Sequence, residues 1–112
     1  MANFLARFGG RLLFAAAVLL FIGMPAHAQD GAALFKTKCA ACHGADGKGD
    51  NSMGKALKLR DLGSDDVQKQ TDAELTDIIT NGKGKMAAYK AQLTDDQIKS
   101  LVGYLRGIAK KK

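Results

Sequence analysis

The sequence predicts a small all-α domain in which three main helices are joined by glycine-rich loops. Apolar residues recur at helical spacing in three segments, and no segment shows the alternation of a half-buried strand. The chain has 112 residues, which suffices for one domain. Beyond residue 28 its aromatic residues are Phe35, Tyr89 and Tyr104 alone. A domain this small with so few aromatic side chains needs stabilisation from a metal, a disulfide or a cofactor.

Residues 1–28 have the three zones of a secretory signal peptide. Arg7 and Arg11 give a positive start, a mostly apolar run follows, and Ala26-His27-Ala28 forms an Ala-x-Ala cleavage pattern. A membrane-spanning helix needs about 20 apolar residues, and this run is shorter, which disfavours an uncleaved membrane anchor. We therefore expect cleavage after residue 28, with residues 29–112 exported as a single domain, to the periplasm and without stable membrane insertion.

The first main helix is expected over residues 31–41, and shorter helical turns near 53–58 and 65–70. The spacing that predicts the first helix is that of Ala32, Phe35 and Cys39. Glycines follow this helix and the second one, and such loops need something central to fold around.

The second and third helices have stronger patterns. The second is expected over residues 72–80, behind a capping box formed by Thr71 and Glu74. The third follows an equivalent box formed by Thr94 and Gln97. The apolar face of the second helix consists of Leu75, Ile78 and Ile79. That of the third consists of Ile98, Leu101, Val102, Leu105 and Ile108.

The string Cys39-Ala40-Ala41-Cys42-His43 has the spacing of a covalent haem attachment site. Cysteines at i and i+3 lie on one side of a helical turn, so both thiols can reach the two vinyl groups of one porphyrin. His43, at i+4 from Cys39, lies on the same side and can bind iron through a ring nitrogen. One covalent haem c would also supply the core that the chain lacks.

Three other interpretations of this string compete with haem. A disulfide between Cys39 and Cys42 would close a very small loop and stabilise little. A thioredoxin-like thiol pair needs a βαβ context that the sequence does not show. Zinc needs about four ligands, and the mature chain offers two cysteines and the single histidine His43.

A second axial ligand would decide what the iron does. With both axial positions filled by protein, the iron shuttles electrons, whereas an open position permits gas binding or catalysis. The candidates are Met53, Met86 and lysines. Met86 follows a flexible glycine loop that can fold across the opposite haem face, but methionines in loops often only fill gaps. Position alone therefore leaves the second ligand open.

These features resemble the class I cytochromes c, mitochondrial-cytochrome-c-like proteins, and specifically the small single-haem bacterial ones. The resemblance covers nearly all of residues 30–109. It rests on the haem string with its continuation Gly44-Ala45-Asp46-Gly47-Lys48-Gly49, on the loop Asn81-Gly82-Lys83-Gly84-Lys85-Met86, and on Gly31, Phe35, Leu101 and Tyr104 in the paired terminal helices.

The resemblance implies the cytochrome c fold around one covalent haem. It assigns Cys39 and Cys42 as thioether anchors, and His43 and Met86 as the axial iron ligands. In this family a proline carbonyl near the haem string accepts the histidine's second N–H. The mature chain has no proline, but Ser52 stands near that place, and the sequence leaves open whether its carbonyl takes the role of the proline carbonyl.

The function implied is that of a soluble, monomeric electron carrier between respiratory redox partners, not an enzyme. Two alternatives are a peroxidase-like haem enzyme or gas-binding module with a labile sixth site, and a haem module of a larger oxidase or dehydrogenase. Residues 31–60 and 82–112 are net positive and residues 61–81 net negative. This asymmetry favours redox partners with acidic docking patches. Nucleic-acid binding is disfavoured, because the basic residues are not interleaved with stacking aromatics.

Overall fold

The computed structural model describes residues 31–111, and within that range the regular elements are all helices. Residues 31–34 are helical and continue without a break into the π-helical segment η1 (Phe35–Cys39) and then α2 (Ala40–His43). The later helices are α3 (Ser52–Ala56), α4 (Asp65–Gln68), α5 (Asp72–Asn81) and α6 (Asp95–Ala109). The predicted all-α class is confirmed, whereas the predicted signal peptide lies outside the described residues.

The predicted main helices are present, with small changes at their ends. The first helix runs two residues further than expected, to His43, and ends because Gly44 adopts a φ of 79°. Both predicted capping boxes are formed. Thr71 Oγ1 accepts from the Glu74 amide at 3.1 Å, and the Glu74 carboxylate accepts from the Thr71 amide at 2.7 Å. The equivalent bonds at the start of α6 measure 3.2 and 2.9 Å.

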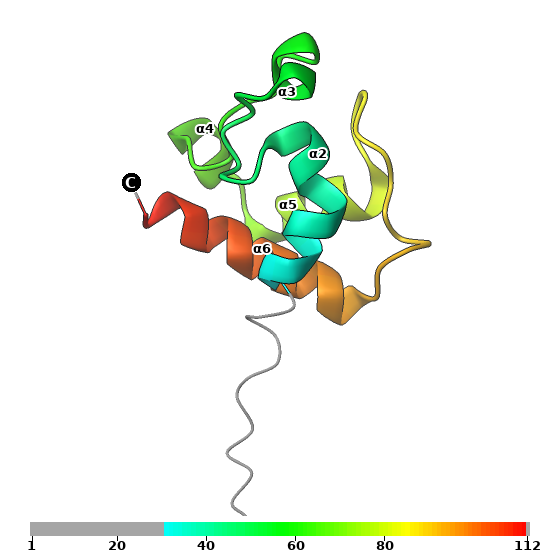
Figure 1. Cartoon of the computed structure of the whole chain (residues 1–112). Coiled ribbons are helices and arrows are strands. Elements are labelled where there is room, and N and C mark those ends of the chain that lie inside the picture. The colour runs from blue at the N-terminus through cyan, green and yellow to red at the C-terminus, as the bar shows by residue number, and fades with distance from the viewer. Residues whose placement is uncertain (1–30, 112) are drawn as a thin grey trace, which may run out of the picture.

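The first helix crosses α6 at close range (Figure 1). At the crossing, Gly31 lies against the carbonyl of Ser100 and the β-carbon of Tyr104. The rings of Phe35 and Tyr104 stack in a tilted arrangement with centroids 5.0 Å apart. A side chain at Gly31 would force the two helices apart, so this glycine permits their close crossing.

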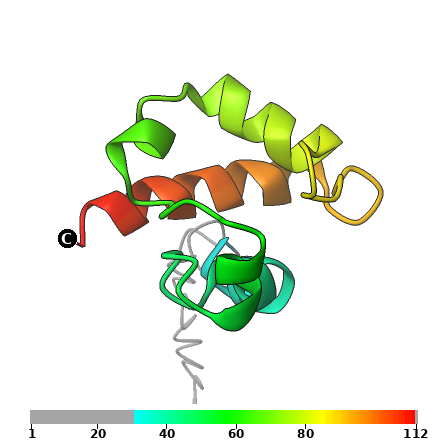
Figure 2. The ribbon, with the colours of Figure 1, turned by 90° about the horizontal axis from the view of Figure 1, so that it is seen from above.

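Helix α5 runs alongside α6, and α3 lies away from this pair (Figures 1 and 2). The buried core gathers where the first helix, α5 and α6 meet. It consists of Phe35, Val67, Leu75, Ile79, Leu93, Ile98, Leu101, Val102 and Leu105. Within residues 31–111, no helix has both the length and the apolar character needed to span a membrane.

Candidate cofactor site

A cavity of about 420 Å³ opens beside this core. Cavities of roughly 300–1,000 Å³ with mainly apolar walls are typical of cofactor and small-molecule sites. Its walls come from the first helix, the segment 57–70, α5, the loop after α5, and α6. Cys39, Cys42, His43 and Met86 all line it. The structure thus brings all four predicted site residues to one cavity, although Met86 lies far from the other three along the chain.

The end of the first helix is held by a small network of polar contacts. The Gly49 amide donates to the His43 carbonyl at 2.7 Å, which closes the glycine loop against the helix end. The Asn51 side chain donates to the Ala41 carbonyl at 2.9 Å and accepts from the Gly54 amide at 2.9 Å. Asn51 therefore caps α3 and ties it to the last turn of α2, which carries the cysteines and the histidine.

The two cysteines are free thiols in the structure. Burial raises the pKa of the Cys39 thiol to about 11, and the nearby Cys42 adds to the rise. Thiol–disulfide catalysts need the opposite, a lowered thiol pKa. A redox-active dithiol is thus disfavoured on chemistry as well as on fold. Within the described part of the chain, no group of three or more His, Cys, Asp or Glu side chains is placed to hold a metal ion.

His43 is held in its neutral form, since burial lowers its pKa. Neutral imidazole is the form that binds a metal ion. Its Nδ1 is enclosed and has no hydrogen-bond partner among the described residues. The Nδ1 atom therefore makes no hydrogen bond to the Ser52 carbonyl. Ser52 is the first residue of α3.

Met86 is placed by a tight backbone hairpin. Lys83 and Met86 exchange two backbone hydrogen bonds, of 3.2 and 3.0 Å, and Gly84 at the tip has a φ of 58°. The Tyr89 hydroxyl donates to the Lys38 carbonyl at 3.1 Å, which links this loop to the first helix. The other candidate, Met53, is 50 % exposed and does not line the cavity. Of the two methionines, only Met86 can reach a group bound there.

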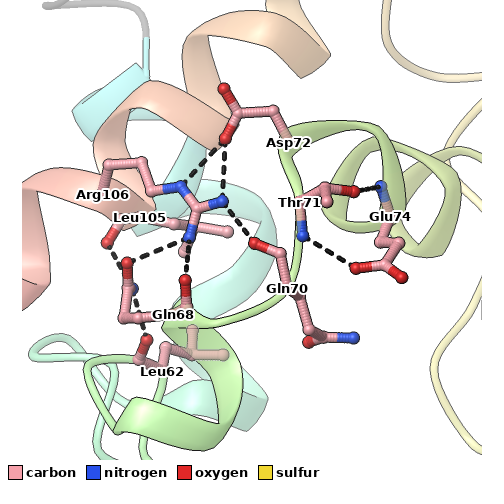
Figure 3. Close-up of polar contacts among 8 residues, drawn as sticks. All are labelled: Leu62, Gln68, Gln70, Thr71, Asp72, Glu74, Leu105 and Arg106. Carbon is pink, nitrogen blue, oxygen red and sulfur yellow. Dashed lines mark hydrogen bonds and ion pairs between the residues drawn. The ribbon is translucent and has the colours of Figure 1, made fainter.

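The segment between α4 and α5 forms one wall of the cavity and is held from outside by Arg106 of α6 (Figure 3). The guanidinium contacts Gln68, Gln70 and Asp72. Of these residues, Gln70 itself lines the cavity.

Cationic side chains surround this cavity. Among the described residues that line it there are five cations and no carboxylate. The cations are Lys38, Lys58, Arg60, Lys83 and Lys85. The negative residues 61–81 contribute only uncharged side chains to the lining. A group bound here would experience a positive electrostatic environment.

Sequence reasoning missed Asn51, Gln68 and Arg106. Asn51 carried a weak signal, because an asparagine before a short helical pattern is a typical N-cap. Gln68 and Arg106 carried no sequence signal, because the hydrogen bonds between them join residues that are 38 apart in the chain.

Known proteins resemble this chain over most of its length. A family model described as cytochrome c oxidase, cbb3-type, subunit III matches residues 26–105. Cytochrome c6 of Leptolyngbya boryana is 41 % identical over 86 residues, which are 77 % of this chain and 98 % of the relative. Subunit FixP of the cbb3-type cytochrome c oxidase of Rhizobium meliloti is 33 % identical over 71 % of this chain and 27 % of the relative.

A solved structure shares the fold. The c-type cytochrome KustC0563 superposes with a TM-score of 0.65 at 32 % sequence identity. The match covers 70 % of this chain and 96 % of that one.

Proposed function

We propose a haem site for this chain, which belongs to the class I c-type cytochromes and is thus an electron-transfer protein with covalent haem c and not an enzyme. In this proposal, Cys39 and Cys42 anchor the haem, and His43 and Met86 are its axial ligands. The observation that carries this assignment is that all four side chains line one cavity. When bound, the haem iron would supply a one-electron Fe(III)/Fe(II) couple.

The chemistry of the residues fits these roles. Burial raises the pKa of the Cys39 thiol to about 11, so this thiol is protonated at neutral pH. Cys39 and Cys42 lie on one turn at the end of the first helix, as attachment to two vinyl groups requires. The imidazole is neutral and its Nδ1 is enclosed, which leaves Nε2 as the nitrogen able to bind iron. Leu75, Ile79 and the other apolar lining residues exclude water, and a dry site favours the less charged Fe(II) state.

We further propose that residues 1–28 are a cleaved signal peptide and that residues 29–112 work in the periplasm. The maturation of c-type haem outside the cytoplasm requires such export.

We propose a monomer, because Met53 is the sole large hydrophobic side chain exposed among the described residues. The cations around the cavity support brief docking to acidic patches on the electron donor and acceptor.

One experiment tests cofactor, attachment and export together. The full-length gene is expressed in a bacterium able to mature c-type cytochromes, and the periplasmic protein is analysed by intact mass and visible spectroscopy. The expected mass is that of residues 29–112 plus one haem. In Cys39→Ser or Cys42→Ser variants, one thioether bond is lost and the spectrum of the reduced protein shifts to longer wavelength. A colourless wild-type protein with two free thiols would overturn the proposal.

The oligomeric state has its own measurement. Gel filtration of the native periplasmic extract should place the haem absorbance at the size of a monomer. Elution with a much larger assembly would instead indicate a haem module of an oxidase or dehydrogenase.

A further inference from the structure

Arg106 makes an unusually dense set of contacts for a single side chain outside the cavity (Figure 3). Its Nη1 donates to the Gln68 backbone carbonyl at 2.8 Å and to the Gln68 side-chain oxygen at 3.2 Å. Its Nη2 donates to the Gln70 carbonyl, and both Nε and Nη2 lie 2.9 Å from the Asp72 carboxylate. One guanidinium therefore contacts the last residue of α4, the connection between α4 and α5, and the first residue of α5.

Gln68 extends this set to a further segment. Its Nε2 donates to the Leu62 carbonyl at 2.9 Å and to the Leu105 carbonyl at 3.0 Å. We call Gln68, Gln70, Asp72 and Arg106 the Arg106 cluster. Through the cluster, the segment before α4, the connection to α5, and helix α6 are tied at one point.

Residues whose backbone carbonyls are bonded within the cluster also line the cavity. Leu62, Gln70 and Leu105 are cavity residues, and all three have a carbonyl bonded within the cluster. Val67, which packs in the core beneath them, lines the cavity as well. By contrast, the Arg106 side chain itself does not line the cavity.

The contacts of Arg106 differ in kind from an ordinary surface ion pair. The Arg106 side chain is only 28 % exposed, and two of its four acceptor atoms are backbone carbonyl oxygens. A nearby pair offers the comparison: Lys69 and Asp66 lie 3.0 Å apart, but their side chains are 73 % and 71 % exposed. An exposed pair contributes little, whereas charge-assisted bonds to partly buried carbonyls contribute more.

We propose that Arg106 is a positioning residue of the haem site: from outside the cavity it holds the wall formed by residues 62–72 closed against α6, and so limits the access of water and external ligands. The inference rests on the proposed function, because it concerns the wall of the cavity assigned to haem. Closure of the wall then depends on one side chain that lies outside the cavity and contacts neither the cofactor nor its ligands.

The test compares four haem-loaded variants with the wild type: Arg106→Met, Arg106→Lys, Lys69→Met and Ile98→Ala. Two rates are measured under conditions in which each protein is fully folded. One is the amide hydrogen exchange of peptides covering residues 60–72. The other is the rate at which imidazole binds the ferric protein, which requires the site to open.

Arg106→Met is expected to raise both rates by roughly tenfold or more, because several charge-assisted hydrogen bonds are lost. Lys69→Met also removes a cation from this region, but the only interaction lost is the solvent-exposed ion pair with Asp66. Both rates should therefore change by less than about twofold. Arg106→Lys keeps the charge near Asp72 but cannot reproduce the fork of bonds, and should lie between. If the Met variant does not accumulate in folded form, the Lys variant decides, with an expected rise of several-fold.

Ile98→Ala distinguishes a specific effect of Arg106 on the cavity wall from a general loss of protein stability. Ile98 is buried in α6 but does not line the cavity. Its truncation should lower the denaturation midpoint without raising the imidazole rate. Unchanged rates in both Arg106 variants would overturn the inference, and so would an equal rise in Ile98→Ala. A wild-type protein that carries no haem would overturn the proposed function instead.

Discussion

Gly31 in the first helix lies directly against the backbone carbonyl of Ser100 in α6. A β-carbon on Gly31 would overlap that carbonyl and would lie 3.2 Å from the β-carbon of Tyr104. Backbone atoms cannot move aside as the end of a flexible side chain can. The glycine therefore determines the distance between the two terminal helices, which carry the cysteines and one wall of the cavity.

Replacing Gly31 with alanine should destabilise the haem-loaded protein by about 1–3 kcal/mol, the usual range for overpacking a tight contact. The measurement is the free energy of unfolding in guanidinium chloride. Gly103→Ala on α6 is the matched control, since nothing lies within 4 Å of a β-carbon there. It should be neutral or stabilising by about 0.5–1 kcal/mol. Equal effects of the two substitutions would contradict the packing argument.

Met86→Leu should convert the protein into one with an open sixth position. Leucine preserves the volume of the side chain but removes the thioether sulfur. The weak near-infrared iron–sulfur band of the ferric protein should disappear, and the reduced protein should bind carbon monoxide. Met53→Leu should change neither property, because Met53 does not line the cavity. The opposite pattern would assign the ligand to Met53.

Lys58→Gly should stabilise the protein. Lys58 follows α3 with a φ of 55°, a left-handed conformation at which glycine is preferred. The strain of a non-glycine residue there is on the order of 1 kcal/mol, so the free energy of unfolding should rise by a similar amount. Lys55→Gly removes the same charge from within α3 and should instead destabilise by roughly 0.5–1 kcal/mol. A loss of stability in both variants would show that the Lys58 side chain has a role of its own.

The double substitution of Lys83 and Lys85 by glutamine should slow oxidation of the ferrous protein by ferricyanide and accelerate its oxidation by a cationic cobalt complex. Both lysines line the cavity, so their charges act on a reagent that approaches it. The two effects should fade as salt rises from 0.01 to 1 M, where the screening length falls from roughly 30 to 3 Å. Lys110 and Lys111, replaced in the same way, do not line the cavity and should have much smaller effects.

Local features of the sequence were sufficient to predict the helices and their starts. The capping boxes of Thr71 and Thr94 are formed as expected, because each joins residues three apart. The haem string occupies the end of the first helix, where a five-residue span presents both cysteines and the histidine. The π-helical segment at Phe35–Cys39 was not predicted, because no short-range pattern distinguishes it from α-helix.

The sequence by itself determined the all-α class and the glycine at the helix crossing, and it predicted haem attachment at Cys39 and Cys42 with His43 as a ligand. Each of these depends on residues close together or on a family pattern. Only the tertiary structure decided what surrounds the site. In the tertiary structure the His43 Nδ1 has no hydrogen-bond partner among the described residues, and Asn51 is bonded to the helix that carries the haem string. The same structure brings Arg106 to the connection between α4 and α5. The physical reason is that these contacts join polar groups from segments whose relative placement is set by core packing, and hydrogen bonds between distant residues leave no periodic trace in the sequence.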